Sequence, residues 1–190
     1  MINRIIKTIK ENREVIERLL SDDHISTIEK AAQIIINALK KGSKLLVFGN
    51  GGSAADSQHL VAELVGRFKK ERKGIPAVAL STNTSTLTAI SNDYGYEISF
   101  ARQIEALGKK GDVAIGISTS GTAKNVIAAI KKAKEIGMLT IALTGKDGGN
   151  LKSVSDLAII VKTSETPRIQ EAHILIIHIL CELIEDALSK

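Results

Sequence analysis

Apolar residues near the start of the chain recur every three to four positions. Ile2, Ile5 and Ile9 begin this spacing, and residues 26–39 repeat it. Such a period places the apolar side chains on one face of a helix. The pattern therefore predicts two amphipathic helices ahead of residue 42.

Beyond residue 42 the apolar residues gather in short continuous runs. Strands of a parallel sheet that is covered on both faces show this pattern, because neither side of the strand meets water. We expect five strands, at 45–48, 77–80, 113–117, 138–143 and 157–161. Helical spacing fills the intervals and follows the last strand, at 53–69, 85–107, 122–135 and 168–188. This alternation predicts an α/β three-layer sandwich with a five-stranded parallel sheet, for which we expect a flavodoxin-like strand order.

The last predicted helix is apolar on nearly all sides, whereas a helix on the surface of a monomer shows a polar face. The N-terminal helices also carry broad apolar stripes, so we predict a homo-oligomer joined through the terminal helices. No linker or repeat divides the chain. We expect a single domain over residues 1–190, with N-terminal helices at 1–41, an α/β core at 42–163 and a C-terminal helix at 164–190.

The composition narrows the function classes. Of the 190 residues 44% are hydrophobic, yet no apolar run reaches the roughly 18 residues that a membrane span needs. The N-terminus is charged at helical intervals and lacks the apolar segment of a secretory signal, so we expect a cytoplasmic protein without membrane contact. The net charge of +5 is dispersed and only 3% of the residues are aromatic, so we expect no nucleic-acid partner. The lone Cys181 is expected to be a reduced, buried thiol.

A glycine-rich turn follows the first predicted strand. Gly51 and Gly52 allow the backbone to approach a ligand closely, and Asn50 and Ser53 add polar side chains. The exposed N–H groups of the helix that begins here favour an anion such as phosphate. The glycine spacing also matches a dinucleotide-binding turn, but that site needs an acidic residue after the second strand, where this chain has Ser81. We therefore favour phosphate and keep a dinucleotide-binding oxidoreductase as a distant alternative.

A second turn of this kind follows the third predicted strand, where Ser118, Thr119 and Ser120 precede a helix. Three hydroxyls and the first N–H groups of the helix make a cradle for a dianionic phosphate, with no need for lysine or magnesium. The structural alternative is a serine-rich helix cap, which would use only one of the hydroxyls. We favour phosphate here as well.

His59 and Glu63 stand at i and i+4 on the helix that follows the first turn. They project from the same side, close enough to share a metal ion or a proton. The last predicted helix adds Gln170 and His178 within a strongly apolar stretch, where polar groups need partners. A straight helix separates these two by about 12 Å, so both can meet one ion only if the helix begins late or neighbouring subunits contribute. His173 is interpreted as a satisfied histidine at an interface.

Four segments together carry a family resemblance: 49–59 (GNGGSAADSQH), 91–97 (SNDYGYE), 118–121 (STSG) and 168–178 (RIQEAHILIIH). They closely resemble the phosphoheptose isomerase family of sugar isomerase (SIS) domain proteins, and the likeness runs nearly end to end. The resemblance implies conversion of sedoheptulose 7-phosphate to D-glycero-D-manno-heptose 7-phosphate, which feeds the lipopolysaccharide core or other surface glycans. It also implies a cytoplasmic homotetramer with active sites shared between subunits and one zinc ion per subunit.

By position, the resemblance assigns the zinc ligands to His59, Glu63, Gln170 and His178. It assigns substrate contacts to residues of the two turns, to two neighbouring polar residues between the turns, and to one of the zinc ligands. These residues are Asn50, Gly51, Gly52, Asn92, Asp93, Ser118, Thr119, Ser120 and Gln170. The chain departs from the family at Ala123, where a serine often stands, so a fourth hydroxyl is missing from the second turn. Thr122 or a backbone N–H is the expected substitute.

An aldose–ketose isomerase moves a proton between C1 and C2 through an enediol, so it needs a base and an electrophile. We assign Glu63 as the base, His178 as the partner acid and zinc as the Lewis acid. A carboxylate bound tightly to zinc is a poorer base, so Glu63 either binds through one oxygen, exchanges off the metal, or leaves the proton to His178. The rival hypothesis is a non-catalytic SIS-domain protein that senses a sugar phosphate or binds the replication initiator DnaA.

Overall fold

The computed structural model of the chain describes residues 1–189. Its centre is a five-stranded parallel sheet with the order β2-β1-β3-β4-β5. The strands are β1 (Leu45–Gly49), β2 (Ala77–Ala79), β3 (Val113–Ser118), β4 (Leu139–Gly145) and β5 (Leu157–Val161). This is the flavodoxin-like order, so the predicted sheet and its strand order are confirmed.

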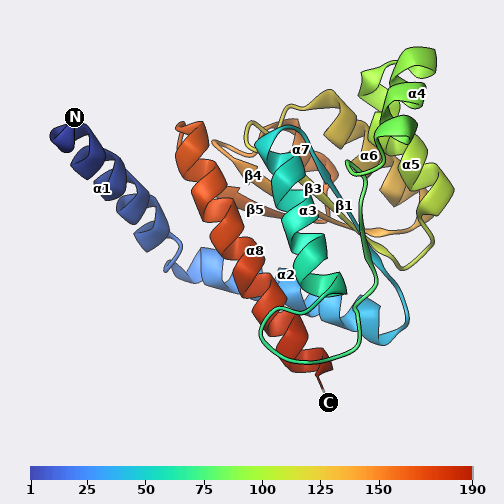
Figure 1. Cartoon of the computed structure of the whole chain (residues 1–190), viewed down its shortest axis with the longest axis horizontal. Coiled ribbons are helices and arrows are strands. Elements are labelled where there is room, and N and C mark those ends of the chain that lie inside the picture. Colours follow the sequence, from blue (N-terminus) through green and yellow to red (C-terminus); the bar gives the residue numbers. More distant parts are fainter. Residues whose placement is uncertain (190) are drawn as a thin grey trace.

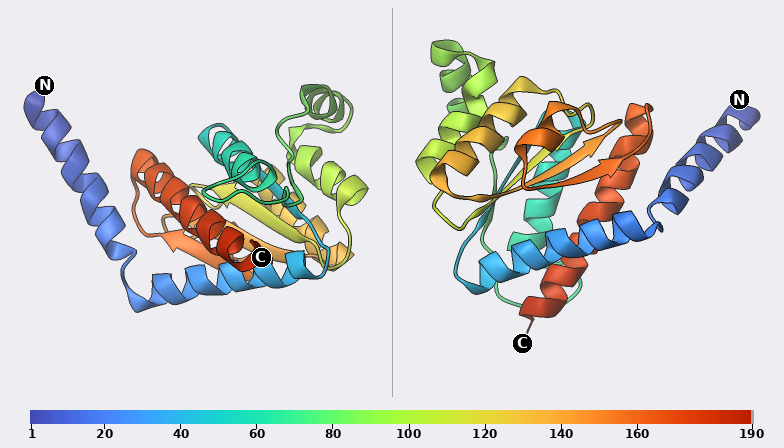
Figure 2. Two further views of the ribbon diagram at one scale, coloured as in Figure 1. Left: turned by 60° about the horizontal axis from the view of Figure 1, so that its bottom comes forward. Right: turned by 180° about the vertical axis from the view of Figure 1, so that it is seen from behind.

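Helices cover both faces of the sheet, as Figure 2 shows from two sides. One face carries α2 (Asp22–Lys40), α3 (Gly52–Val65) and α8 (Thr166–Leu188). The other face carries α4 (Thr84–Tyr94), the 3-10 helix η1 (Tyr96–Ile98), α5 (Ser99–Leu107), α6 (Lys124–Ile136) and α7 (Gly149–Val154). The predicted three-layer α/β sandwich is therefore confirmed.

Alternate residues of each strand enter different cores. In β3, Val113, Ile115 and Ile117 pack toward α2, α3 and α8, while Ala114 packs toward α5 and α6. Gly116 lies on the second face, where an added Cβ would stand only 2.9 Å from a methyl carbon of Val126 on α6. Both faces of the strand are thus dry, which explains the continuous apolar runs of the sequence.

Two predicted helices differ from the structure, and one helix was not predicted. The helix expected over 53–69 ends at Val65, and the chain continues as a loop to β2. The single stretch expected over 85–107 is divided into α4, η1 and α5, because Gly95 takes a φ of 90° that no helix contains. The short helix α7 was not predicted, since six residues between two strands carry no helical period.

The N-terminal helix α1 (Ile2–Arg18) projects away from the rest of the chain (Figures 1 and 2). Its apolar side chains are exposed, Ile2 by 72% and Ile9 by 63%. A groove of about 700 Å³ between α1, α2 and α8 continues this surface. Its apolar lining includes Ile16, Ile28, Leu175, Ile179 and Leu183. Among residues 1–189 no helix combines the length and apolar character that crossing a membrane requires.

Candidate active site

The two predicted phosphate turns lie next to each other. The strand order reverses between β1 and β3, which makes the carboxyl ends of these strands the place where open α/β sheets bind ligands. Gly49 at the end of β1 pairs with Ile117 of β3, and an added Cβ at Gly49 would stand 2.9 Å from the Ile117 carbonyl oxygen. Gly51 takes a φ of 54° and caps α3, and both Gly51 and Gly52 are exposed, whereas Ser53 is buried.

A reciprocal amide pair links the first turn to α6, the helix that follows the second turn. Asn50 Nδ2 donates to Asn125 Oδ1 at 2.8 Å, and Asn125 Nδ2 donates to Asn50 Oδ1 at 2.9 Å. The Tyr96 hydroxyl also donates to Asn50 Oδ1, at 2.7 Å. Asn50 was predicted to touch substrate, and in this chain its amide is used to hold the first turn against α6 and η1. Asn125 and Tyr96 were not among the predicted site residues.

The hydroxyls of the second turn are partly buried. Ser118 is 6% exposed, and Thr119 and Ser120 are half-buried. Ser120 Oγ lies 2.9 Å from Thr122 Oγ1, so the hydroxyl of Thr122 already belongs to the turn. Ala123 is the N-cap of α6 and offers no side-chain hydrogen bond to the first N–H groups of that helix. The N–H of Val126 donates to Asn125 Oδ1 at 3.0 Å, so the N–H groups of Lys124 and Asn125 are the ones offered to an anion in place of the missing hydroxyl.

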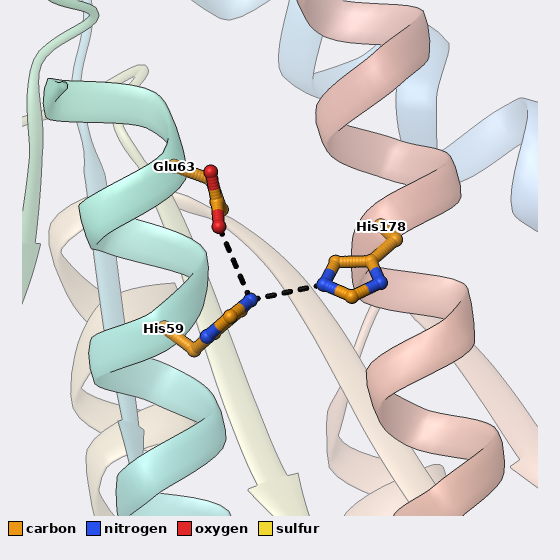
Figure 3. Close-up of side chains that lie close together, drawn as sticks. All are labelled: His59, Glu63 and His178. Atoms are coloured by element: carbon orange, nitrogen blue, oxygen red, sulfur yellow. Dashed lines mark hydrogen bonds and ion pairs between the residues drawn. The ribbon is translucent and has the colours of Figure 1, made fainter. Parts of the chain in front are cut away.

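Three side chains with metal-binding atoms converge between α3 and α8, which lie side by side (Figures 1 and 3). His59 Nε2 lies 3.3 Å from Glu63 Oε1 on α3 and 2.9 Å from His178 Nε2 on α8. All three candidate ligand atoms lie within 4.8 Å of one another. Here we call His59, Glu63 and His178 the triad.

The donor set of the triad suits a divalent zinc ion. Two imidazoles and one carboxylate are a common ligand set of catalytic zinc sites, which keep a further position open. Zinc–nitrogen bonds of 2.0–2.1 Å in a tetrahedral site imply ligand atoms roughly 3.3 Å apart. The two distances from His59 Nε2, 3.3 Å and 2.9 Å, lie close to that value. The side chain of His59 is 43% exposed, so the site is open on one side in the single chain.

Gln170 does not lie with the triad in this chain. Helix α8 begins at Thr166, ahead of Gln170, so the helix does not begin late. The side-chain amide of Gln170 lies against Gly52 instead, where an added Cβ would collide with Nε2. Two helical turns, about 12 Å along α8, separate Gln170 from His178. A similar length of α3, about 10 Å, separates Gly52 in the phosphate turn from His59 in the triad.

Asn92 and Asp93 lie on the other face of the sheet from the triad, on α4. Both side chains are exposed, and Asn92 Nδ2 donates to Asp93 Oδ1 at 2.9 Å. None of the residues of α4 is buried. Their assignment as substrate contacts remains a prediction, as do the assignments in the two turns.

Comparisons with known proteins agree with this architecture and site. Residues 9–145 match the family model described as SIS domain. A phosphoheptose isomerase of Nitratiruptor sp. is 55% identical over 189 residues, which cover 98% of this chain and 100% of that protein. This chain belongs to the phosphoheptose isomerase family.

Solved structures of the phosphoheptose isomerase family have the same fold. The enzyme from Neisseria gonorrhoeae is 43% identical with a TM-score of 0.90, and the one from Francisella tularensis is 34% identical with a TM-score of 0.94. In both cases the match covers 97% of this chain and 98% of the other. The similarity therefore includes the terminal helices as well as the sheet.

Two further titratable groups of this family member lie close to the site. Asp56 is half-buried one turn before His59, and its Oδ2 has no hydrogen-bond partner among the described residues. Burial raises the pKa of Asp56 to about 6, against the opposing effect of His59.

His173 is fully buried within the chain, so its interpretation as an interface histidine was wrong. Its Nε2 lies 3.1 Å from the Thr144 carbonyl oxygen of β4.

His173 makes the folded chain sensitive to acid. Burial lowers its pKa to about 4, with partial compensation from the hydrogen bond to Thr144. An unfolded chain binds the proton near pH 6.5, so this contribution to stability is intact above that pH and is lost as the pH falls toward 4. When the pH falls from 7 to 5, we expect the titration of His173 to lower the free energy of unfolding by about 2 kcal/mol.

Urea unfolding of the wild type and of His173→Gln at pH 7 and pH 5 measures this effect. Glutamine keeps a donor for the Thr144 carbonyl and does not titrate. Over this pH interval the free energy of unfolding of the variant should therefore fall by about 2 kcal/mol less than that of the wild type. An equal loss in both proteins would contradict the assignment.

Proposed function

We propose that this chain converts sedoheptulose 7-phosphate to D-glycero-D-manno-heptose 7-phosphate in the cytoplasm, for the heptose of lipopolysaccharide or another surface glycan. Membership of the phosphoheptose isomerase family supports the substrate and the reaction, an aldose–ketose isomerisation. The observation that carries the proposal within this chain is the convergence of His59, Glu63 and His178 on one point. We also propose that residues 1–190 form one SIS domain.

The substrate would be held at its two ends. The turns 50–53 and 118–120 would bind the phosphate through hydroxyls and helix N–H groups, with Asn92 and Asp93 as further substrate contacts. The triad would hold C1 and C2 with their oxygens. Gly51 and Gly52 suit the phosphate end because they are exposed at the start of α3.

The reaction needs two kinds of proton transfer. Glu63 removes the proton from C1 of the ketose, which leaves an enediol between C1 and C2, and then returns a proton to C2. His178 moves the hydroxyl proton from the oxygen of C1 to that of C2, so that C1 becomes the aldehyde carbon. Glu63 and His178 lie on two sides of His59, within the same 4.8 Å cluster, so both side chains can stand beside adjacent carbons of one substrate.

We propose that His59, Glu63 and His178 hold one zinc ion, with Gln170 as a fourth ligand. When bound, zinc supplies a Lewis acid that stabilises negative charge on the substrate oxygens. Glu63 would hold the ion through one oxygen and keep the other for the proton, and His178 would hold it through Nε2 and carry its exchangeable proton on Nδ1.

A second copy of the chain would complete the site. Gln170 is two helical turns from His178 on a continuous helix, so one ion cannot meet both residues of the same chain. Because Gln170 lies against Gly52, the copy that supplies Gln170 also brings its own phosphate turn. The exposed apolar face of α1 and the groove beside it support an assembly through the terminal helices, which we propose to be a homotetramer with shared active sites.

The non-catalytic alternative accounts for less of this structure. A scaffold that binds DnaA, or a sensor of sugar phosphates, has no need of two imidazoles and a carboxylate within 4.8 Å. The dinucleotide alternative lacks its acidic residue, since β2 is followed by Leu80 and Ser81.

Glu63→Gln tests the assignment of the base. Glutamine keeps the size of the side chain but cannot accept the proton, so we expect turnover of sedoheptulose 7-phosphate to fall at least about 100-fold. Aldose formation by the purified protein, with and without a chelator, measures it. Glu135→Gln on α6, which removes an exposed carboxylate on the other face of the sheet, is the matched control and should leave turnover unchanged. Turnover close to wild type in Glu63→Gln would reject the assignment.

Shared sites can be tested by mixing two inactive variants. His59→Gln and Gln170→Ala each leave every site of their own homotetramer defective. In co-expressed, randomly mixed tetramers, about a quarter of the sites would combine an intact triad with an intact Gln170 from another copy. We therefore expect activity to return in the mixture. Mixtures that stay as inactive as the two parents would show that each site belongs to one chain.

A further inference from the structure

The loop between α3 and β2, residues 66–76, is bound to α8 by one buried carboxylate. Figure 1 shows this loop passing the C-terminal half of α8. The backbone N–H groups of Phe68, Lys69 and Lys70 donate to the carboxylate of Glu185 at 3.0, 2.7 and 2.9 Å. Glu185 is only 1% exposed. Three successive N–H groups on one anion fix the backbone of this part of the loop.

Arg72 joins the same carboxylate to the end of α3. Its Nε donates to Glu185 Oε1 at 3.1 Å, and the two side chains are 4% and 1% exposed. Its Nη1 donates to the carbonyl of Leu64 at 2.8 Å and its Nη2 to that of Glu63 at 2.7 Å. Burial favours the neutral form of Glu185, but the three N–H donors and Arg72 outweigh it and hold the pKa of Glu185 below its usual value. The loop, the end of α3 and α8 are thereby one connected unit.

The fixed loop carries Phe68 onto the ring of His178. The two rings are stacked, with centroids 5.6 Å apart and planes 30° apart. His59 lies against the same imidazole with a centroid distance of 5.1 Å, so His178 has an aromatic neighbour in Phe68 and a triad partner in His59. The Lys69 ammonium stands 5.5 Å from the centroid of Phe68 and pairs with Glu182 at 2.6 Å.

We propose that Phe68 is a positioning residue, which holds the His178 ring so that Nε2 faces His59 and Glu63. The inference deepens the proposed function, because it concerns the same metal and proton-transfer site. Phe68 has no polar side-chain atom, so it acts only through the orientation of His178. The Glu185 carboxylate and Arg72 set the position of Phe68 in turn. Side chains that orient a metal ligand in this way affect metal affinity and turnover more than substrate binding.

Phe68→Leu and Phe68→Tyr test the proposal as a pair. Leucine keeps an apolar side chain but loses the stacked ring, so we expect zinc affinity, measured by competition with a chelator, to fall about ten-fold or more. The turnover number for sedoheptulose 7-phosphate should fall by a similar factor, while KM stays within about two-fold. Tyrosine keeps the ring and should restore both values to near wild type.

A matched control separates positioning from stability. Ile184→Val removes one methyl group from the buried face of α8, six residues beyond His178, and should lower stability without changing zinc affinity. Glu185→Gln weakens the attachment of the loop and should reproduce the zinc effect of Phe68→Leu wherever thermal unfolding shows that the variant is folded.

Three outcomes would overturn the inference: zinc affinity of Phe68→Leu within about two-fold of wild type, a Phe68→Tyr variant as impaired as Phe68→Leu, or a wild-type protein that takes up no zinc. Absence of isomerase activity in the wild type would reject the proposed reaction instead. The zinc measurements would still decide whether Phe68 positions His178.

Discussion

The packing of α8 along α3 determines the geometry of the whole candidate site. The two helices run in the same direction, so one register fixes three contacts in succession. Gln170 lies against Gly52, His178 lies against His59, and Glu185 accepts the N–H of Phe68 just beyond the end of α3. A shift of one residue would rotate each of these side chains by about 100° and would separate them.

This packing also explains why α8 is apolar on nearly all sides. Ile169, Ile176 and Ile184 are fully buried against the sheet and its neighbouring helices. Other apolar residues of α8 line the groove beside α1. The carboxylate of Glu185 and Nε2 of His173 have specific partners, since an unpaired polar group in such surroundings costs a few kcal/mol, whereas Nδ1 of His173 has none among the described residues.

Continuity of α8 imposes the second constraint. A helix that runs unbroken from Thr166 to Leu188 holds Gln170 and His178 apart, whatever the side chains prefer. The four ligand groups implied by the family resemblance would therefore have to meet between copies of the chain. In the proposed assembly, the exposed α1 and the shared site are two consequences of one arrangement, in which a single chain leaves its apolar face uncovered and its triad without Gln170.

The local parts of this structure could be predicted from the sequence. The strand runs and the i, i+4 pair of His59 and Glu63 follow from periodicity, which depends on near neighbours, whereas the strand order was expected only from the fold class. The partner of His59 could not be derived in this way, because His178 is 119 residues away. The same holds for Asn50 and Asn125, which are 75 residues apart. It also holds for Phe68, which was predicted to lie in a helix but lies in a loop whose N–H groups donate to Glu185. Only the family resemblance linked His178 to the triad in advance.

We propose that α3 and α8 together build one metal site. Zinc content per chain, measured for the wild type and for His178→Gln after loading and dialysis against metal-free buffer, tests it most directly. We expect about one zinc ion per wild-type chain, as a site of two imidazoles and a carboxylate would bind, and a large loss of zinc in the variant. Equal zinc content in the two proteins, or none in the wild type, would contradict it.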